Sequence, residues 1–88
     1  MGGSGLRHRR VRGFSVERLI ESTRRGGFDY LRTESRRSPA GHEVVFVLFT
    51  RSGSDSVWWV RVTHNGWLSE GVTVKSSLDR ELELQVGL

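Results

Sequence analysis

Two apolar runs in the middle of the chain decide the fold: Glu43–Thr50 (EVVFVLFT) and Ser56–Thr63 (SVWWVRVT). Both have strand length and are rich in β-branched and aromatic residues, and the loop between them, Arg51–Asp55 (RSGSD), is typical of a hairpin. The first run is apolar on both faces, which predicts a central position in a sheet. The second run alternates, so one face carries Trp58, Val60 and Val62 and the other carries Val57, Trp59 and Arg61.

The segment before this hairpin predicts a helix and another strand. The helix spans Ser15–Arg25, because its first residue is a good N-cap and Gly26–Gly27 ends it. A strand is predicted at Phe28–Thr33, followed by a loop at Glu34–Gly41 that is rich in Ser, Pro, Gly and Arg. The helix has one narrow apolar stripe at i, i+3, i+4, i+7 spacing, formed by Val16, Leu19, Ile20 and Thr23.

The C-terminal tail fits two kinds of structure. Leu82, Leu84 and Val86 alternate with polar residues, which is a strand pattern. Leu78, Leu82 and Val86 are also spaced as a helical stripe, and Ser77 could cap such a helix. We predict a helix because Leu, Glu, Gln and Arg are helix formers, and the strand stays open as the alternative.

These elements predict one α+β domain over residues 14–88. Its N-terminal helix packs on a three-stranded antiparallel sheet, and a C-terminal helix follows (α-β-β-β-α). The alternative is one helix on a four- or five-stranded antiparallel sheet. Residues 1–13 are predicted to be a flexible linker and a basic arm, since they contain little to bury.

Composition narrows the function classes. The 88 residues include no cysteine, which excludes disulfides and thiolate metal sites. The three histidines match no zinc spacing, so we expect no metal and no cofactor. There is no apolar run long enough to span a membrane and no signal-peptide pattern, so we predict a cytoplasmic protein without membrane contact. Oligomeric state is left open.

Positive charge is concentrated in the first half of the chain. Residues 1–42 hold ten arginines and four acidic residues, whereas residues 43–88 hold four basic and six acidic residues, for a net charge of +4. This distribution suggests RNA or another nucleic acid as partner, and the alternative is a merely solvated, arginine-rich surface. The candidate nucleic-acid-binding residues are Arg7, Arg9, Arg10, Arg12, Arg36, Arg37 and Lys75.

Several short segments form a series in order along the chain: Ser15–Ile20, Gly27–Phe28, Leu31–Arg32, Gly41–His42, Phe46 and Val62–Gly71. Together they are similar to the HicA family of small toxins. The chain departs from the family pattern at Ala40–Gly41, where a serine normally precedes the histidine, and in the acidic run after Gly71. The resemblance implies a double-stranded-RNA-binding-like fold, metal-independent cleavage of messenger RNA and a protein antitoxin as partner.

His42 is the candidate catalytic residue. RNA cleavage without a metal needs a base, an acid and a cation for the phosphorane charge, and the pKa of histidine suits proton transfer near neutral pH. We expect His42 at the start of the central strand, beside Arg36 and Arg37, whose guanidinium groups could hold a phosphate. The alternative is that His42 is an ordinary solvent-exposed loop residue.

The tryptophans point to a second kind of function. Adjacent Trp58 and Trp59 must face opposite sides of a strand, so we expect one to be buried and the other partly exposed. An exposed ring could stack on a base or anchor a protein, and we single out Trp59 and Trp67 as partner-binding candidates. The alternative function is therefore a non-catalytic protein-interaction module of phage, viral or immunity type, which binds through a sheet edge or an exposed tryptophan.

Overall fold

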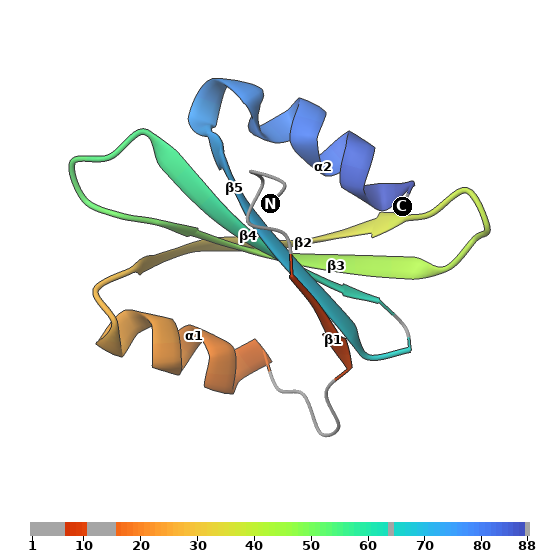
Figure 1. The fold of residues 1–88 in the computed structure, drawn as a ribbon, viewed down its shortest axis with the longest axis horizontal. Coiled ribbons are helices and arrows are strands. Elements are labelled where there is room, and N and C mark those ends of the chain that lie inside the picture. The colour runs from red at the N-terminus through yellow and green to blue at the C-terminus, as the bar shows by residue number, and fades with distance from the viewer. Residues whose placement is uncertain (1–6, 11–15, 64, 88) are drawn as a thin grey trace.

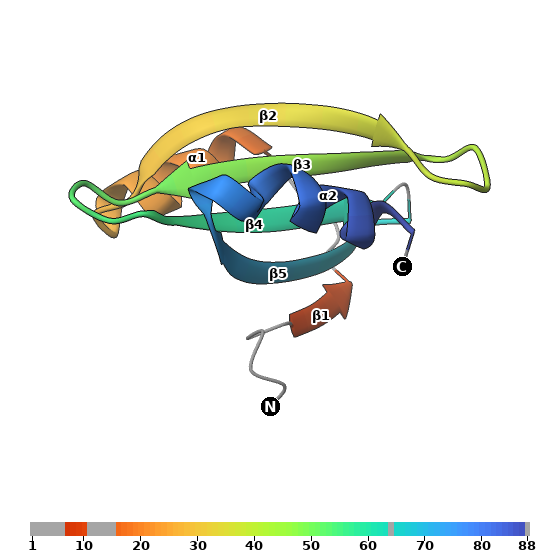
Figure 2. The ribbon, with the colours of Figure 1, turned by 90° about the horizontal axis from the view of Figure 1, so that it is seen from above.

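The computed structural model describes residues 7–10, 16–63 and 65–87. Within them, a five-stranded antiparallel sheet in the order β1-β5-β4-β3-β2 carries one helix on each face (Figures 1 and 2). The elements are β1 (Arg7–Arg10), α1 (Val16–Arg25), β2 (Asp29–Arg37), β3 (Glu43–Thr50), β4 (Ser56–Thr63), β5 (Trp67–Val74), the 3-10 turn η1 (Lys75–Ser77) and α2 (Leu78–Val86).

The hairpin predicted from the two apolar runs is confirmed. Strands β3 and β4 have the predicted bounds and pair antiparallel, with Leu48 opposite Trp59 and Phe46 opposite Arg61. Strand β3 lies between β2 and β4, and its apolar side chains are buried on both faces of the sheet. The doubly apolar pattern of β3 therefore reflects two helical layers, one on each side (Figure 2).

Each helix covers its own hydrophobic core. On one face, Leu78 and Leu82 of α2 pack over Trp59 and its neighbours in β3 and β4. On the other face, the predicted stripe of α1 packs over the opposite side of the same strands. The α2 core comprises Val44, Phe46, Leu48, Val57, Trp59, Leu78 and Leu82, and the α1 core comprises Val47, Phe49, Val60 and Leu68 with Val16, Leu19 and Ile20 against it.

The predicted α+β class is confirmed, and the sheet has more strands than the main prediction gave it. The described residues form five strands, as the alternative allowed, and they also include the predicted C-terminal helix. The unpredicted strands are β5, which follows β4 in the chain, and β1 near the chain start. Strand β5 pairs along β4, and β1 pairs in turn with Trp67–Glu70 of β5.

Residues 7–10 correct the prediction of a wholly flexible arm. Arg7–Arg10 forms β1, whose backbone pairs antiparallel with β5. A strand at the edge of a sheet can be held by backbone hydrogen bonds to its neighbour alone, without alternating apolar and polar side chains. The composition of this segment therefore gives no signal for a strand.

Strand β2 also differs from prediction, because it continues through Arg37 and shortens the expected loop to residues 38–42. A register shift between Tyr30 and Arg32 places a bulge at Leu31, so Arg32, Glu34 and Arg36 share the α2 face. The polar second half of β2 pairs with β3 as far as Arg37, and ion pairs of Arg36 also join it to that helix.

The helix ends are partly as predicted. Gly26 and Gly27 end α1, where Gly27 has a φ of 89° that favours glycine, and the predicted cap at Ser15 lies outside the described residues. Ser77 stands at the N-cap of α2, but its side chain makes no capping hydrogen bond. No helix in the described ranges is long and apolar enough to cross a membrane.

Candidate nucleic-acid interface

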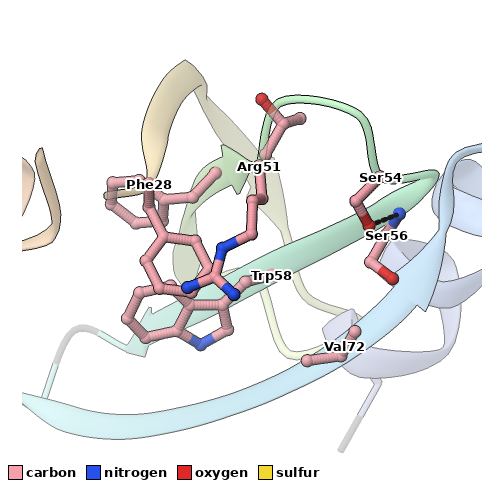
Figure 3. Close-up of a pocket in the computed structure, with 8 residues that line it drawn as sticks. Phe28, Arg51, Ser54, Ser56, Trp58 and Val72 are labelled. Atoms are coloured by element: carbon pink, nitrogen blue, oxygen red, sulfur yellow. Dashed lines mark hydrogen bonds between the residues drawn. The ribbon is translucent and has the colours of Figure 1, made fainter. Parts of the chain in front are cut away.

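A groove lies on the α1 face of the sheet, beyond the C-terminal end of α1. Helix α1 has 10 residues, about 15 Å, whereas the eight-residue strands beneath it run about 27 Å. The helix is therefore too short to cover the whole face, and a cavity of about 190 Å³ opens at the uncovered end (Figure 3). Its lining is Phe28, Phe49, Thr50, Arg51, Ser54, Ser56, Trp58 and Val72.

Packed aromatic rings form the base of this groove. The ring centroid of Trp58 lies 5.2 Å from that of Phe28 and 5.1 Å from that of Phe49. The Trp58 Nε1–H donates a hydrogen bond of 2.9 Å to Glu70 Oε1, which fixes the orientation of the indole. Phe28 and Trp58 are only half-buried, so they present rigid aromatic surface to solvent.

A guanidinium group lies over these rings. The Arg51 Cζ is 4.4 Å from the centroid of Phe28, a cation–π geometry, and the side chain reaches back over the groove from the end of β3 (Figure 3). The hydroxyls of Ser54 and Ser56 lie on the same rim, and Val72 of β5 lies across the opening with 59% of its surface exposed. The groove thus combines flat apolar surface, hydroxyl groups and a cation.

Further cations lie at the same end of the sheet, on the left in Figure 1, which holds the end of α1, the β3–β4 loop and, on the side of α2, the β5–α2 connection. Arg24 is in the last turn of α1, four residues before Phe28 in the chain, and Lys75 follows Val74, which pairs with Ser56. Among the described residues, the side chains of Arg24, Arg51 and Lys75 form no hydrogen bond or ion pair with the protein. They can bind an anion without breaking a hydrogen bond or an ion pair, although Asp29 and Asp55 lie at this end too.

His42 lies at the opposite end of the sheet. It is exposed in the β2–β3 loop, where its backbone N–H donates to Ser38 Oγ at 3.2 Å. Arg37 is beside it, with its Nη1 donating to the Gly41 carbonyl at 2.8 Å. Lys75 is about 25 Å away along the strands, so the structure does not bring the predicted base and this predicted phosphate contact together.

Arg36 and Arg37 both line a cavity of about 420 Å³ together with Ser35 and Glu43, but their side chains leave β2 on opposite faces of the sheet. Neighbouring residues of a strand face opposite sides, and Arg36 faces α2. Its guanidinium is 3.0 Å from Glu34, 2.9 Å from Asp79 and 3.0 Å from Glu83, and the hydrogen bond to Asp79 helps raise the pKa of Arg36. Arg36 therefore fastens α2 to β2, and its charge is already matched by carboxylates.

Glu34, in the middle of this network, makes stability depend on pH. Partial burial acts to raise the pKa of its carboxyl, but hydrogen bonds from Arg32 and Arg36 outweigh that effect and hold the pKa below 4.5. A carboxyl group whose pKa is lower in the folded state than in the unfolded state stabilises the folded protein at pH values above the unfolded-state pKa. This stabilisation is lost as the pH falls through the folded-state pKa. We expect urea unfolding to show Glu34→Gln less stable than the wild type at pH 7, with the difference shrinking towards pH 3. An equal difference at both pH values would contradict this assignment.

The tryptophan prediction is half right. One ring of the adjacent pair is buried and the other half-buried, but the buried one is Trp59, with 1% of its surface exposed beneath α2. Trp59 is thus a core residue and cannot be the partner-binding ring, and Trp58 holds the exposed position. Trp67 begins β5 and pairs with Arg10, and its side chain lies outside the described part of the structure.

The remaining candidates are the arginines near the chain start. Arg7, Arg9 and Arg10 belong to β1 through their backbone, and their side chains lie outside what the structure describes. Arg12 falls outside the described residues altogether. In the ranges that are described, no group of three or more His, Cys, Asp or Glu could hold a metal ion.

Sequence reasoning missed the residues that form the groove, Phe28, Arg51 and Trp58. The signal was present in part, because a ten-residue helix cannot cover a face formed by eight-residue strands. The position of α1 on the sheet decides which end of the face stays open. The hydrophobic periodicity of the helix predicts its buried side and does not predict this position.

No family model, curated protein or solved structure matches this chain. The similarity to HicA toxins therefore stays a prediction that rests on the sequence segments alone.

Proposed function

We propose that this protein binds nucleic acid through the groove at the end of α1. The observation that carries the proposal is the Arg51 guanidinium stacked on Phe28 beside half-buried Trp58. Aromatic rings next to a free cation are the combination with which proteins hold a base and its phosphate. The net charge of +4 and the cations Arg24 and Lys75 at the same end add attraction for a polyanion.

Salt dependence tests this proposal. If Arg24, Arg51 and Lys75 each neutralise about one phosphate, the plot of log K against log salt has a slope of about −2 for a single strand. Arg51→Ala is expected to make that slope shallower by about 0.7 and to weaken binding. The measurement is the fluorescence anisotropy of a labelled 12-nucleotide RNA, titrated at KCl concentrations from about 50 to about 300 mM.

Arg80→Ala is the matched control, because it removes the same charge from an exposed position on α2, which covers the other face of the sheet. It is expected to leave the slope unchanged. Equal effects of the two substitutions would mean that only overall charge matters and that the groove is not the site. Absence of RNA binding at 50 mM KCl would overturn the proposal and favour an apolar protein partner, whose binding depends little on salt.

RNA cleavage centred on His42 is a second candidate, favoured by its exposure beside the Arg37 guanidinium. With Arg36 held by carboxylates, the cation for the phosphorane charge would have to be Arg37. We expect a time course in EDTA to show RNA cleavage by the wild type and at least tenfold slower cleavage by His42→Ala. This candidate would be contradicted if the folded wild type left the RNA intact, or if both proteins cleaved it at equal rates. Binding without catalysis by His42 would then remain.

A further inference from the structure

We infer that the groove accepts one unpaired base, so that the protein prefers single-stranded nucleic acid to duplex. This inference rests on the proposed function and specifies its ligand. It starts from the size of the groove: about 190 Å³ is below the range of pockets that enclose drug-sized molecules, roughly 300–1,000 Å³, and suits a single ring system.

The lining suits the face of a ring rather than its edge. Phe28, Phe49 and Trp58 form an apolar base, and Val72 closes the side towards β5 (Figure 3). In a duplex the faces of the bases are covered by their stacked neighbours, and only their edges reach the grooves. An aromatic surface in a recess can therefore stack only on a base that has left the helix or was never paired.

The packing of the rings limits where the base can lie. The centroids of Phe28 and Trp58 are 5.2 Å apart and their planes are inclined by 55°, which leaves no room for a base between them. The open space is bounded instead by Trp58, Val72 and the Arg51 side chain. A base there would lie against the indole, which the Glu70 hydrogen bond already holds in place.

Arg51 supplies what a lysine could not. Its planar guanidinium stacks on Phe28 and leaves its N–H groups available, because none donates to the protein among the described residues. The group can stay flat against the rings and donate to the phosphate next to the stacked base. Lysine at this position would keep the charge and lose both the stacking and the forked donors.

The test compares an unstructured 12-nucleotide RNA with a blunt duplex of the same length, using anisotropy at one fixed salt concentration. The variants are Arg51→Lys and, as matched control, Arg80→Lys; both keep the net charge, and both positions are exposed. We expect the wild type to bind the single strand at least about tenfold more tightly than the duplex. Arg51→Lys should lose most of that preference, whereas Arg80→Lys should keep it.

The outcomes separate the inference from the proposed function. Equal or tighter binding of the duplex would overturn the single-base inference and leave nucleic-acid binding intact. An unchanged preference in Arg51→Lys would overturn the part of the inference that rests on the Arg51 guanidinium, because a positive charge at residue 51 would then suffice. Failure of the wild type to bind either RNA would overturn the proposed function and the inference together.

Discussion

Replacing Leu82 by alanine is expected to lower the free energy of unfolding by about 2–5 kcal/mol. Leu82 has no exposed surface and lies in the core that α2 forms with Trp59 and Phe46. Removing its side chain loses buried apolar contacts and leaves a cavity that the rigid sheet beneath cannot fill. In thermal unfolding followed by circular dichroism, the midpoint should fall by at least about 10 °C for a domain of this size.

Leu84→Ala is the matched control, because it is the same substitution two residues along in the same helix. Leu84 is 61% exposed, and we expect a change within about 0.5 kcal/mol. The pair also tests the element itself, since residues 82 and 84 would share one face of a strand and lie on different faces of a helix. Equal losses for the two variants would contradict the helix.

Replacing Gly71 by alanine is expected to destabilise the protein by about 1–3 kcal/mol through overpacking. Gly71 lies directly opposite Trp59 in the β4–β5 pair, and the ring covers the place where a side chain would start. A Cβ at Gly71 would lie 2.5 Å from Cζ2 of Trp59, so the buried indole would have to move. Urea unfolding of the variant should show a lower midpoint, and the loss should be smaller in a Trp59→Phe background, where the ring is shorter.

Gly26→Ala is the control for the general effect of removing a glycine. The nearest atom to a Cβ at Gly26 is 3.5 Å away, which is ordinary contact, and its φ does not require glycine. We expect it to be neutral or stabilising by about 0.5 kcal/mol, because alanine restricts the unfolded chain. A loss as large as that of Gly71→Ala would show that the clash with Trp59 is not the cause.

The local parts of the fold were predictable because their signals are local. Strands β3 and β4 carry their β-branched and aromatic residues in unbroken runs, and helix α1 has its glycine stop. The second half of β2 was not predictable, because its polar residues have the composition of a loop, and Arg36 finds its partner Asp79 only when α2 is in place. That contact joins residues more than 40 positions apart, which no local pattern contains.

The candidate site shows the same division. The alternating pattern predicts that Trp58 and Trp59 face opposite sides of the sheet. The pattern does not distinguish the two sides, so it cannot predict which tryptophan is fully buried. Gly71 opposite Trp59 was the missing clue, and it has meaning only once the β4–β5 register is known. Arg36 and Arg37 were placed together beside His42 from their closeness in sequence, although neighbouring strand residues point to opposite faces.

Both outer strands of the sheet are poor templates for aggregation. Strand β2 has charged residues at five of its nine positions and a bulge at Leu31, and the other outer strand, β1, is the sequence RHRR. A second chain adding to either edge would have to strip water from these charges and, at β2, follow a kinked ladder. The arginines that look like a binding signal in the sequence thus also help to keep concentrated protein from forming fibrils.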